Sequence, residues 1–222
     1  MISYPIAMEI AGATALWNRP DTGDCPVSYP APTYSAVKAI FESILWGPAI
    51  EIVPTKVELC MPVQYHTYTT NYGGPYRSSK AIGNGSNYQL LATVLVDVCY
   101  KLYGEVRPNP DKSRIPEGAI EWDRKTTSPG HAYQSIFNRR LQRGQCYSTP
   151  SLGLREFTAY YFGPLREETK VYASMDNIVI SSMLREVFSG GYRSPVSYVF
   201  DQNVQIVEGC LSYPERRDHC AQ

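Results

Sequence analysis

The sequence predicts an α+β fold, because stretches with the two-residue period of a half-buried strand alternate with two stretches that have helical spacing. The clearer helical stretch carries apolar residues at positions 37, 40, 41, 44 and 45, and the second carries them at 133, 136, 137 and 141. Strand-like stretches flank both helices, in the order strand, helix, strand, strand, helix, strand. This is the split βαβ order of ferredoxin-like folds, including the RNA-recognition fold.

The first elements each rest on a local pattern. Apolar side chains alternate with other side chains over residues 6–10, which predicts a first strand with one buried face. A loop rich in proline and glycine is expected from about residue 18 to residue 33. Ser35 is the expected N-cap of the first helix, and Gly47 followed by Pro48 is its expected end.

The middle of the chain predicts two strands separated by an exposed loop. Alternation over residues 57–65 indicates a long strand, and residues 72–87 are rich in Gly, Ser, Asn and Tyr, which is typical of a loop. Residues 90–103 are almost continuously apolar and β-branched, as in a central strand. A second loop is expected over residues 107–128, and Ser128 with Pro129 predicts the start of the second helix.

After Gly144 the pattern becomes strand-like again. Strands are expected over residues 155–162, 170–175 and 183–188, and a hairpin over 198–207 is expected to turn at residues 201–203. These elements predict an antiparallel sheet at the C-terminal end of the chain.

Composition restricts the class of protein. The chain has 222 residues with 21 Lys and Arg against 21 Asp and Glu, so a generic coating protein for nucleic acid is disfavoured. A neutral protein still binds RNA when its positive charge is concentrated on one face. Six cysteines without a C-x-x-C pair, and no visible secretion signal, indicate free thiols in a reducing cytoplasm.

The sequence predicts no resident cofactor, metal or membrane span. It contains no P-loop, dinucleotide fingerprint, H-E-x-x-H or Gly-x-Ser-x-Gly motif. Cys210, His219 and Cys220 would give a metal only three ligands at irregular spacing. No apolar stretch reaches the length of a membrane span.

The most distinctive segment, residues 137–146, places three arginines at the end of the second helix and stops the helix with a glycine. Arginine forks held on rigid elements bind phosphate oxygens, and exposed aromatic rings stack on bases. The candidate RNA-binding residues are Arg19, Arg139, Arg140, Arg143 and Arg155, the last on an expected strand, with Tyr72, Tyr76 and Tyr88 in the tyrosine-rich loop. The alternatives are a solvated helix face for the arginines and packing within the loop for the tyrosines.

Two blocks of sequence carry a family resemblance. One covers residues 137–146 and 150–157, and the other covers Arg19-Pro20, residues 27–30, Pro32-Thr33, Ser35-Ala36, residues 42–44, Trp46 and Pro48. In these blocks the chain resembles the Dvulg subtype of the CRISPR-associated Cas-five family, the small subunit of type I-C Cascade complexes. The resemblance implies a ferredoxin-like domain over residues 1–145 and a small antiparallel C-terminal sheet over residues 146–222.

The resemblance also implies partners. They are the 5′ handle of the CRISPR RNA, a Cas-seven-type backbone subunit, a Cas-eight-type large subunit and, indirectly, the target DNA. Trp46, at the end of the first helix, and the tyrosine-rich loop are candidates for the surface that contacts them.

The family's RNA-processing activity uses a Tyr or His just before the tryptophan that ends the first helix, and a Lys-His pair at the start of the second. Here Leu45 precedes Trp46, and the pair falls on Ala132-Tyr133 or, with a slip of two residues, on Gly130-His131. Leucine transfers no proton, and neither alignment supplies the lysine. We therefore predict an RNA-binding structural subunit.

Two alternatives stay open. One is a metal-independent endoribonuclease with a rearranged site around His131, Tyr133 and Lys125, in which His131 lies at the positive end of its helix, where the neutral imidazole is favoured. The other is an RNA-recognition module outside CRISPR.

Overall fold

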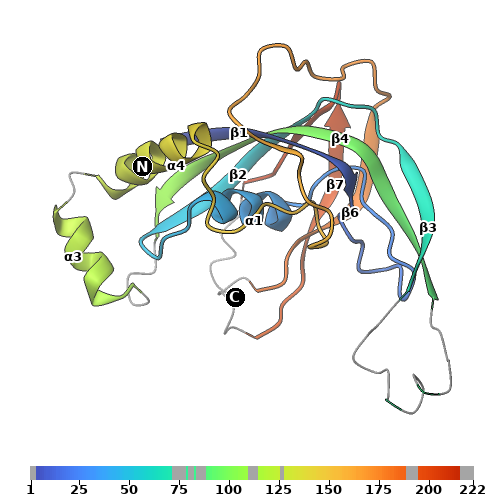
Figure 1. Cartoon of the computed structure of the whole chain (residues 1–222), viewed down its shortest axis with the longest axis horizontal. Coiled ribbons are helices and arrows are strands. Elements are labelled where there is room, and N and C mark those ends of the chain that lie inside the picture. The colour runs from blue at the N-terminus through green and yellow to red at the C-terminus, as the bar shows by residue number, and fades with distance from the viewer. Residues whose placement is uncertain are drawn as a thin grey trace.

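One sheet of eight strands organises the chain in the computed structural model, which describes residues 4–71, 79, 83, 89–109, 115–125, 128–188 and 195–215. Its order is β5 (Tyr161–Gly163), β1 (Tyr4–Ala15), β4 (Gln89–Pro108), β2 (Ile50–Leu59), β8 (Cys210–Ser212), β7 (Val199–Val207) and β6 (Ile178–Glu186), with β3 (Tyr65–Asn71) also paired to β4. All of these strand pairs are antiparallel (Figure 1).

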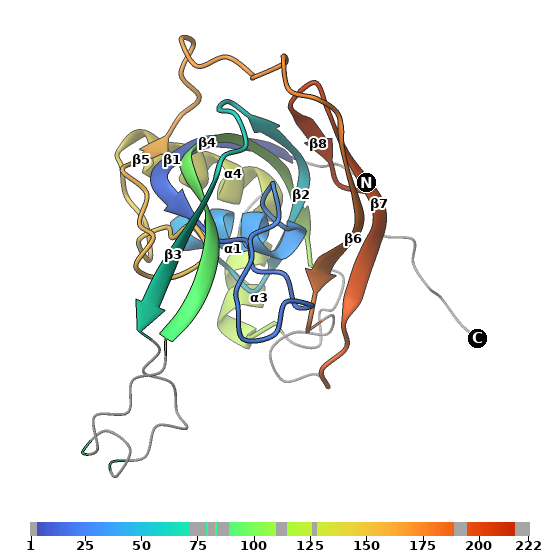
Figure 2. The same ribbon diagram turned by 90° about the vertical axis from the view of Figure 1, so that its right-hand side faces the viewer.

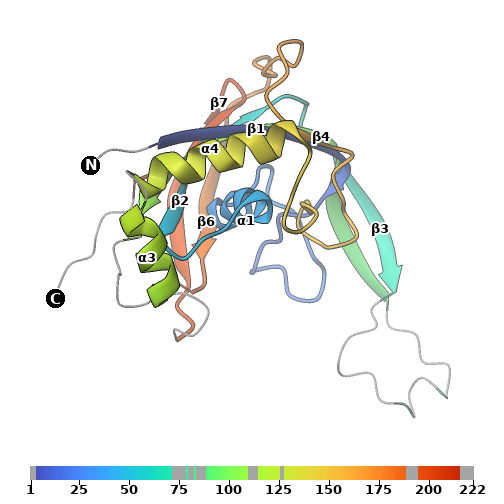
Figure 3. The same cartoon turned by 60° about the vertical axis from the view of Figure 1, so that its left-hand side comes forward.

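Helices α1 (Tyr34–Ile44) and α4 (Pro129–Gln142) pack against the same face of this sheet. The rings of Phe41 and Phe137, both fully buried, meet between them with centroids 5.8 Å apart. Helix α1 contacts both β2 and β6, so the sheet curves around it (Figure 2). A third helix, α3 (Glu117–Lys125), precedes α4 at one end of the molecule (Figure 3).

Several sequence predictions are confirmed. The first strand and the central strand lie in β1 and β4, although each is longer than predicted. Helix α4 begins at Pro129 after an N-cap at Ser128. It ends before Gly144, whose φ of 63° is the left-handed conformation that commonly terminates a helix.

Three predictions in the first half of the chain were wrong in detail. The N-cap of α1 is Thr33 and not Ser35, because the Thr33 hydroxyl accepts a hydrogen bond from the Ala36 N–H at 3.2 Å. The strand expected over residues 57–65 is broken between β2 and β3. The register along β4 shifts by one residue at this break, opposite Asp97, which has a φ of 52°. The loop expected over residues 107–128 contains α3.

The C-terminal strands differ more from the prediction. Within residues 155–162 only the end forms a strand, and Arg155 lies in a turn; residues 170–175 form no strand. The expected hairpin over 198–207 is the single strand β7, and the chain turns at Glu208-Gly209. Polar residues 201–203 resembled a turn in the sequence, but they lie within β7, where Asp201 and Gln202 pair with β6. The Asp201 carboxylate is largely buried in a salt bridge with Arg185 at 3.0 Å, and Gln202 and Asn203 are exposed.

On the sheet face away from α1 and α4, a buried carboxylate of β1 forms hydrogen bonds with the segment that follows β5. Glu9 is fully buried, and it accepts hydrogen bonds from the Arg166 backbone N–H, the Arg166 guanidinium and the Thr169 hydroxyl, each at about 2.8 Å. Burial alone would raise the pKa of Glu9, but these hydrogen bonds outweigh burial and lower it.

The division into residues 1–145 and 146–222 stays a prediction, although strands from both parts belong to one sheet. Strand β5 pairs with β1, and β8 pairs with β2. None of the helices in the described part of the chain combines the length and apolar composition needed to cross a membrane.

Candidate nucleic-acid interface

The C-terminal end of α1 is held against α4 and the segment that follows it. The guanidinium of Arg140 donates a hydrogen bond to the Ile44 carbonyl oxygen at 2.8 Å. The backbone N–H groups of Tyr147 and Ser148 donate to the Ser43 carbonyl oxygen at 2.7 and 3.1 Å. These bonds satisfy carbonyl groups that a helix end leaves without an intrahelical partner, and the Arg140 charge lies at the negative end of the α1 dipole.

Two large aromatic side chains emerge from this helix corner. Trp46 follows α1 and is 62% exposed, and Tyr147 follows α4 and is 82% exposed. Leaving aromatic rings of this size in water is unfavourable, so neighbouring exposed rings commonly mark a binding surface. Trp46 therefore does not close the core, which was the alternative role for a tryptophan at a helix end.

Two arginines at the end of α4 have side chains that the fold does not use. Arg139, in the last turn, and Arg143, the C-cap residue, are exposed, and their guanidinium groups have no hydrogen-bond or ion-pair partner among the described residues. We call Trp46, Arg139, Arg143 and Tyr147 the corner surface.

The other predicted RNA-binding residues differ in their surroundings. Arg140 is half-buried by its bond to α1, so it does not belong to a solvated helix face. Arg155 is exposed in the turn after α4. Arg19 forms a salt bridge with Asp21 at 2.7 Å and lies over the ring of Tyr29. Tyr72, Tyr76 and Tyr88 lie outside the described residues.

The candidate catalytic residues lie on different sides of the structure. His131 is exposed, and its ring meets the ring of Tyr4 at the start of β1, with centroids 6.0 Å apart. Tyr133 faces α1 instead, because its ring fills the space beside Gly47, where a Cβ atom would lie 2.0 Å from the tyrosine oxygen. Lys125 belongs to α3 and pairs with Glu121 at 2.7 Å.

Leu45 and Ala132, which the family resemblance aligns with catalytic groups, carry no side chain that transfers a proton, and neither does Gly130, which replaces Ala132 if the register slips by two residues. Leu45 is half-buried and packs against the hydrophobic core, and Ala132 is half-buried on α4. His131 and Tyr133, two residues apart, point to opposite flanks of α4 because each residue advances the helix by about 100°. His219 and Cys220 lie outside the described residues, and within the described part of the chain no three metal-ligating side chains converge.

Sequence analysis missed Tyr147 and the structural use of Arg140. Tyr147 has no periodic pattern around it, and only its position shortly after the glycine that ends α4 distinguishes it. The partner of Arg140 is a backbone carbonyl 96 positions away, which no local pattern reveals.

The fold and the corner surface define a class of protein: a mixed α/β protein built on an antiparallel sheet, with arginine and aromatic side chains displayed together. The comparison with known families is more specific. Residues 6–196 match the family described as CRISPR-associated protein (Cas_Cas5). The chain belongs to this CRISPR-associated family.

Two relatives carry the same printed name, "CRISPR pre-crRNA endoribonuclease Cas5d". The protein from Mannheimia succiniciproducens is 29% identical over 171 residues, which cover 70% of this chain and 71% of the relative. The protein from Thermus thermophilus is 28% identical over 160 residues, which cover 72% of this chain and 64% of the relative. The match therefore spans less than two thirds of the second relative.

A solved structure supports the fold. The structure titled "Crystal Structure of CRISPR-associated Protein" superimposes with a TM-score of 0.71 at 20% identity, and the match covers 98% of this chain and 96% of that chain. At this identity the likeness concerns the fold alone.

Proposed function

We propose that this protein is an RNA-binding structural subunit of a type I-C-like Cascade in the cytoplasm. It holds the 5′ handle of the CRISPR RNA and caps the backbone filament, in contact with a Cas-seven-type subunit and a Cas-eight-type subunit. The observation that carries the proposal is the corner surface, in which the exposed rings of Trp46 and Tyr147 offer stacking platforms at the corner where α4 ends, and Arg139 and Arg143 at that end have no side-chain partner among the described residues. Membership of a CRISPR-associated family supports the choice of RNA.

We also infer that β1, α1, β2, β4, α4 and β5 form a ferredoxin-like unit. Support comes from the strand order β5-β1-β4-β2 and from the two helices that share one face. Strands β1 and β2 run parallel on either side of β4 and are joined through α1, which is the split βαβ arrangement.

The test is the affinity for a single-stranded RNA that carries the handle sequence. Replacing Trp46 or Tyr147 by alanine should weaken binding by about 5- to 150-fold, because stacking on an aromatic ring contributes about 1–3 kcal/mol per base. Tyr198→Ala is the matched control, since Tyr198 is 63% exposed on the approach to β7. Unchanged affinity in both corner variants, with all variants folded, would exclude the corner surface as the RNA site.

A second function is a metal-independent endoribonuclease that matures precursor CRISPR RNA. The printed names of the two relatives favour it. The candidate catalytic groups do not favour an endoribonuclease, because Leu45 and Ala132 cannot transfer protons and because His131 and Tyr133 face different neighbours. Losing a positioned general base costs about 10²–10⁴ in rate.

Incubation of the purified chain with repeat RNA in EDTA separates the two functions. We expect bound, intact RNA. A single cut within the repeat that is abolished by His131→Ala or Tyr133→Phe would establish the enzyme and displace the structural role.

A further inference from the structure

Two cysteines lie opposite each other where β2 and β3 separate along β4. Leu59 pairs with Tyr100, and the next residue of each strand gives Cys60 and Cys99. The Cys60 N–H donates a hydrogen bond to the Cys99 carbonyl oxygen at 2.9 Å. Directly opposed, hydrogen-bonded residues of antiparallel strands have Cα atoms about 5.5 Å apart, which is within the range that a disulfide spans.

Both thiols are free and face a shared polar environment on the side of the sheet away from α1 and α4. They are 8% and 7% exposed, and they pack together with Ala11 and the partly buried Tyr161. The Cys99 thiol donates a hydrogen bond to the Glu9 carboxylate at 3.6 Å. Cys99 is therefore oriented by the carboxylate that also binds Arg166.

The two sulfur atoms differ in acidity. The neighbouring Cys99 thiol and the nearby Lys101 ammonium lower the pKa of Cys60 despite its burial. The pKa of Cys99 is raised by the neighbouring Cys60 thiol, by burial and by the Glu9 carboxylate, to which the Cys99 thiol donates its proton. Because the thiolate is the nucleophile, Cys60 is the thiol that reacts first.

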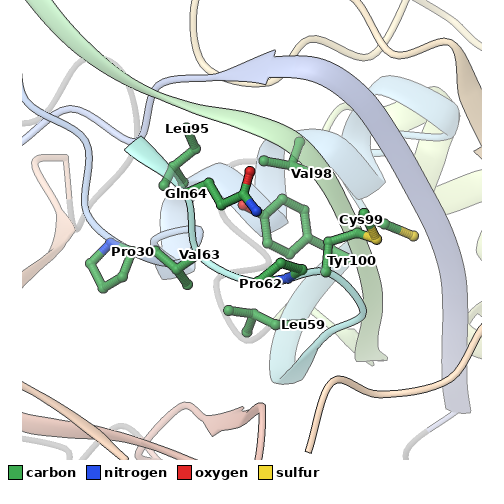
Figure 4. A pocket seen from close by; sticks show the side chains of 10 residues that line it. Pro30, Leu59, Pro62, Val63, Gln64, Leu95, Val98, Cys99 and Tyr100 are labelled. Atoms are coloured by element: carbon green, nitrogen blue, oxygen red, sulfur yellow. The ribbon is translucent and has the colours of Figure 1, made fainter. Parts of the chain in front are cut away.

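A small hollow lies beside this region. It is at the break between β2 and β3 and is lined by Leu59, Met61, Pro62, Leu95, Cys99 and Tyr100 among others (Figure 4). Met61, next to Cys60, is 42% exposed. The cysteine pair therefore lies close to the surface, and an oxidant would reach Cys60 through local opening at this break.

We propose that Cys60 and Cys99 are a peroxide-reactive dithiol site. The Cys60 thiolate attacks one oxygen of a peroxide: the S–O bond forms, the O–O bond breaks, and the departing hydroxide takes up a proton. The Cys99 sulfur then attacks the Cys60 sulfenic acid: the S–S bond forms, the S–O bond breaks, and the Cys99 proton leaves with the hydroxide as water. Two thiols thus lose two electrons and reduce one peroxide to water.

The disulfide would join the end of β2 to β4 and remove the thiol donor from Glu9. It would leave the corner surface unchanged, because that surface lies at the helices on the other face of the sheet. The site is thus independent of the proposed RNA interface, and RNA affinity should not change on oxidation.

The test uses the full chain, reduced and then freed of reductant, with a few equivalents of hydrogen peroxide. The expected product loses two hydrogen atoms in mass and yields a linked peptide pair containing Cys60 and Cys99 under non-reducing digestion. Exposed Cys25 is the internal control. Oxidation of Cys25 or Cys146 with Cys60 and Cys99 still free would overturn the proposal.

Variants resolve the order of the two steps. In Cys99→Ser, dimedone should trap a sulfenic acid at Cys60, because no thiol remains to resolve it. In Cys60→Ser, Cys99 should acquire the adduct at least about tenfold more slowly, since its thiolate is disfavoured. If Cys99 in Cys60→Ser is labelled as fast as Cys60 in Cys99→Ser, the assigned roles are refuted. The peptide map of the wild-type chain tests the disulfide even if a variant does not fold.

Discussion

The side chains of Arg139, in the last turn of α4, and Arg143, its C-cap residue, are exposed and have no partner in the described structure, so their double alanine variant tests the proposed interface directly. Each phosphate neutralised on a single strand contributes about 0.7 to the slope of log affinity against log salt. At ~0.15 M salt this corresponds to about fourfold in affinity per contact, and to about fifteenfold for two contacts. The slope itself should fall by about 1.4.

Folding stability should be nearly unchanged in this variant. Exposed substitutions that break no hydrogen bond or ion pair usually alter the free energy of unfolding by less than about 0.5 kcal/mol. A loss of RNA affinity therefore cannot be attributed to unfolding if urea denaturation curves of the variant and the wild type coincide.

The assay is fluorescence anisotropy with labelled single-stranded handle RNA at several salt concentrations. The control is Arg124→Ala with Lys170→Ala, which removes the same charge from two exposed positions on α3 and on the segment after β5. We expect the control to bind nearly as the wild type does. An equal loss in both double variants would indicate general electrostatics, and unchanged affinity of the Arg139/Arg143 variant would refute the assignment.

Two further predictions concern stability. Glu9→Gln should lower the free energy of unfolding at pH 7 by about 2–4 kcal/mol, because Arg166 loses its charged partner. The folded pKa of Glu9 is lowered, so the stability that its charge contributes is fully present above the unfolded pKa of about 4.3 and is lost as pH falls from there through the lower folded pKa. The difference between the urea curves of wild type and variant should therefore narrow as pH falls below about 4.3. Glu156→Gln, at an exposed position, should change neither the free energy of unfolding at pH 7 nor its dependence on pH. Arg140→Ala should cost about 1–2 kcal/mol by leaving the Ile44 carbonyl without its donor, and an unaltered urea midpoint with reduced RNA affinity would instead make Arg140 a phosphate ligand.

The sequence was most informative where local chemistry decides structure. The start and the end of α4 follow from Pro129 at its first position and from Gly144 just beyond its last turn. Ser128 occupies the N-cap position without a side-chain hydrogen bond to the helix, and its hydroxyl is bonded to the Tyr4 hydroxyl instead. The break between β2 and β3 was missed because apolar alternation continues through Pro62, while the register shift depends on Asp97 in a different strand. Helix α3 was missed because it is only 9 residues long, contains Gly118 and consists mainly of charged side chains between expected loop residues.

For the candidate interface too, the sequence revealed local patterns but not the contacts between segments that are distant in the chain. The arginines of α4 were evident as a cluster in the sequence, but their division into a structural residue and exposed ones depends on contacts with α1. Arg140 reaches a carbonyl of α1, whereas Arg139 and Arg143 do not. The apolar periodicity of a sequence shows which side of a helix is buried, but it does not show which other element packs against each side.

Binding and cleavage make different demands on the α1–α4 corner. Binding needs exposed rings and unpartnered charges, which tolerate small displacements because stacking and phosphate contacts are not steeply directional. Cleavage needs a base within hydrogen-bond reach of one hydroxyl and a cation beside the developing charge. In this chain Leu45 packs inward, Tyr133 fills the space beside Gly47, and His131 lies against β1. On the proposed function, cleavage would therefore require new groups on two elements, whereas the proposed binding surface consists of side chains that no other part of the described fold uses.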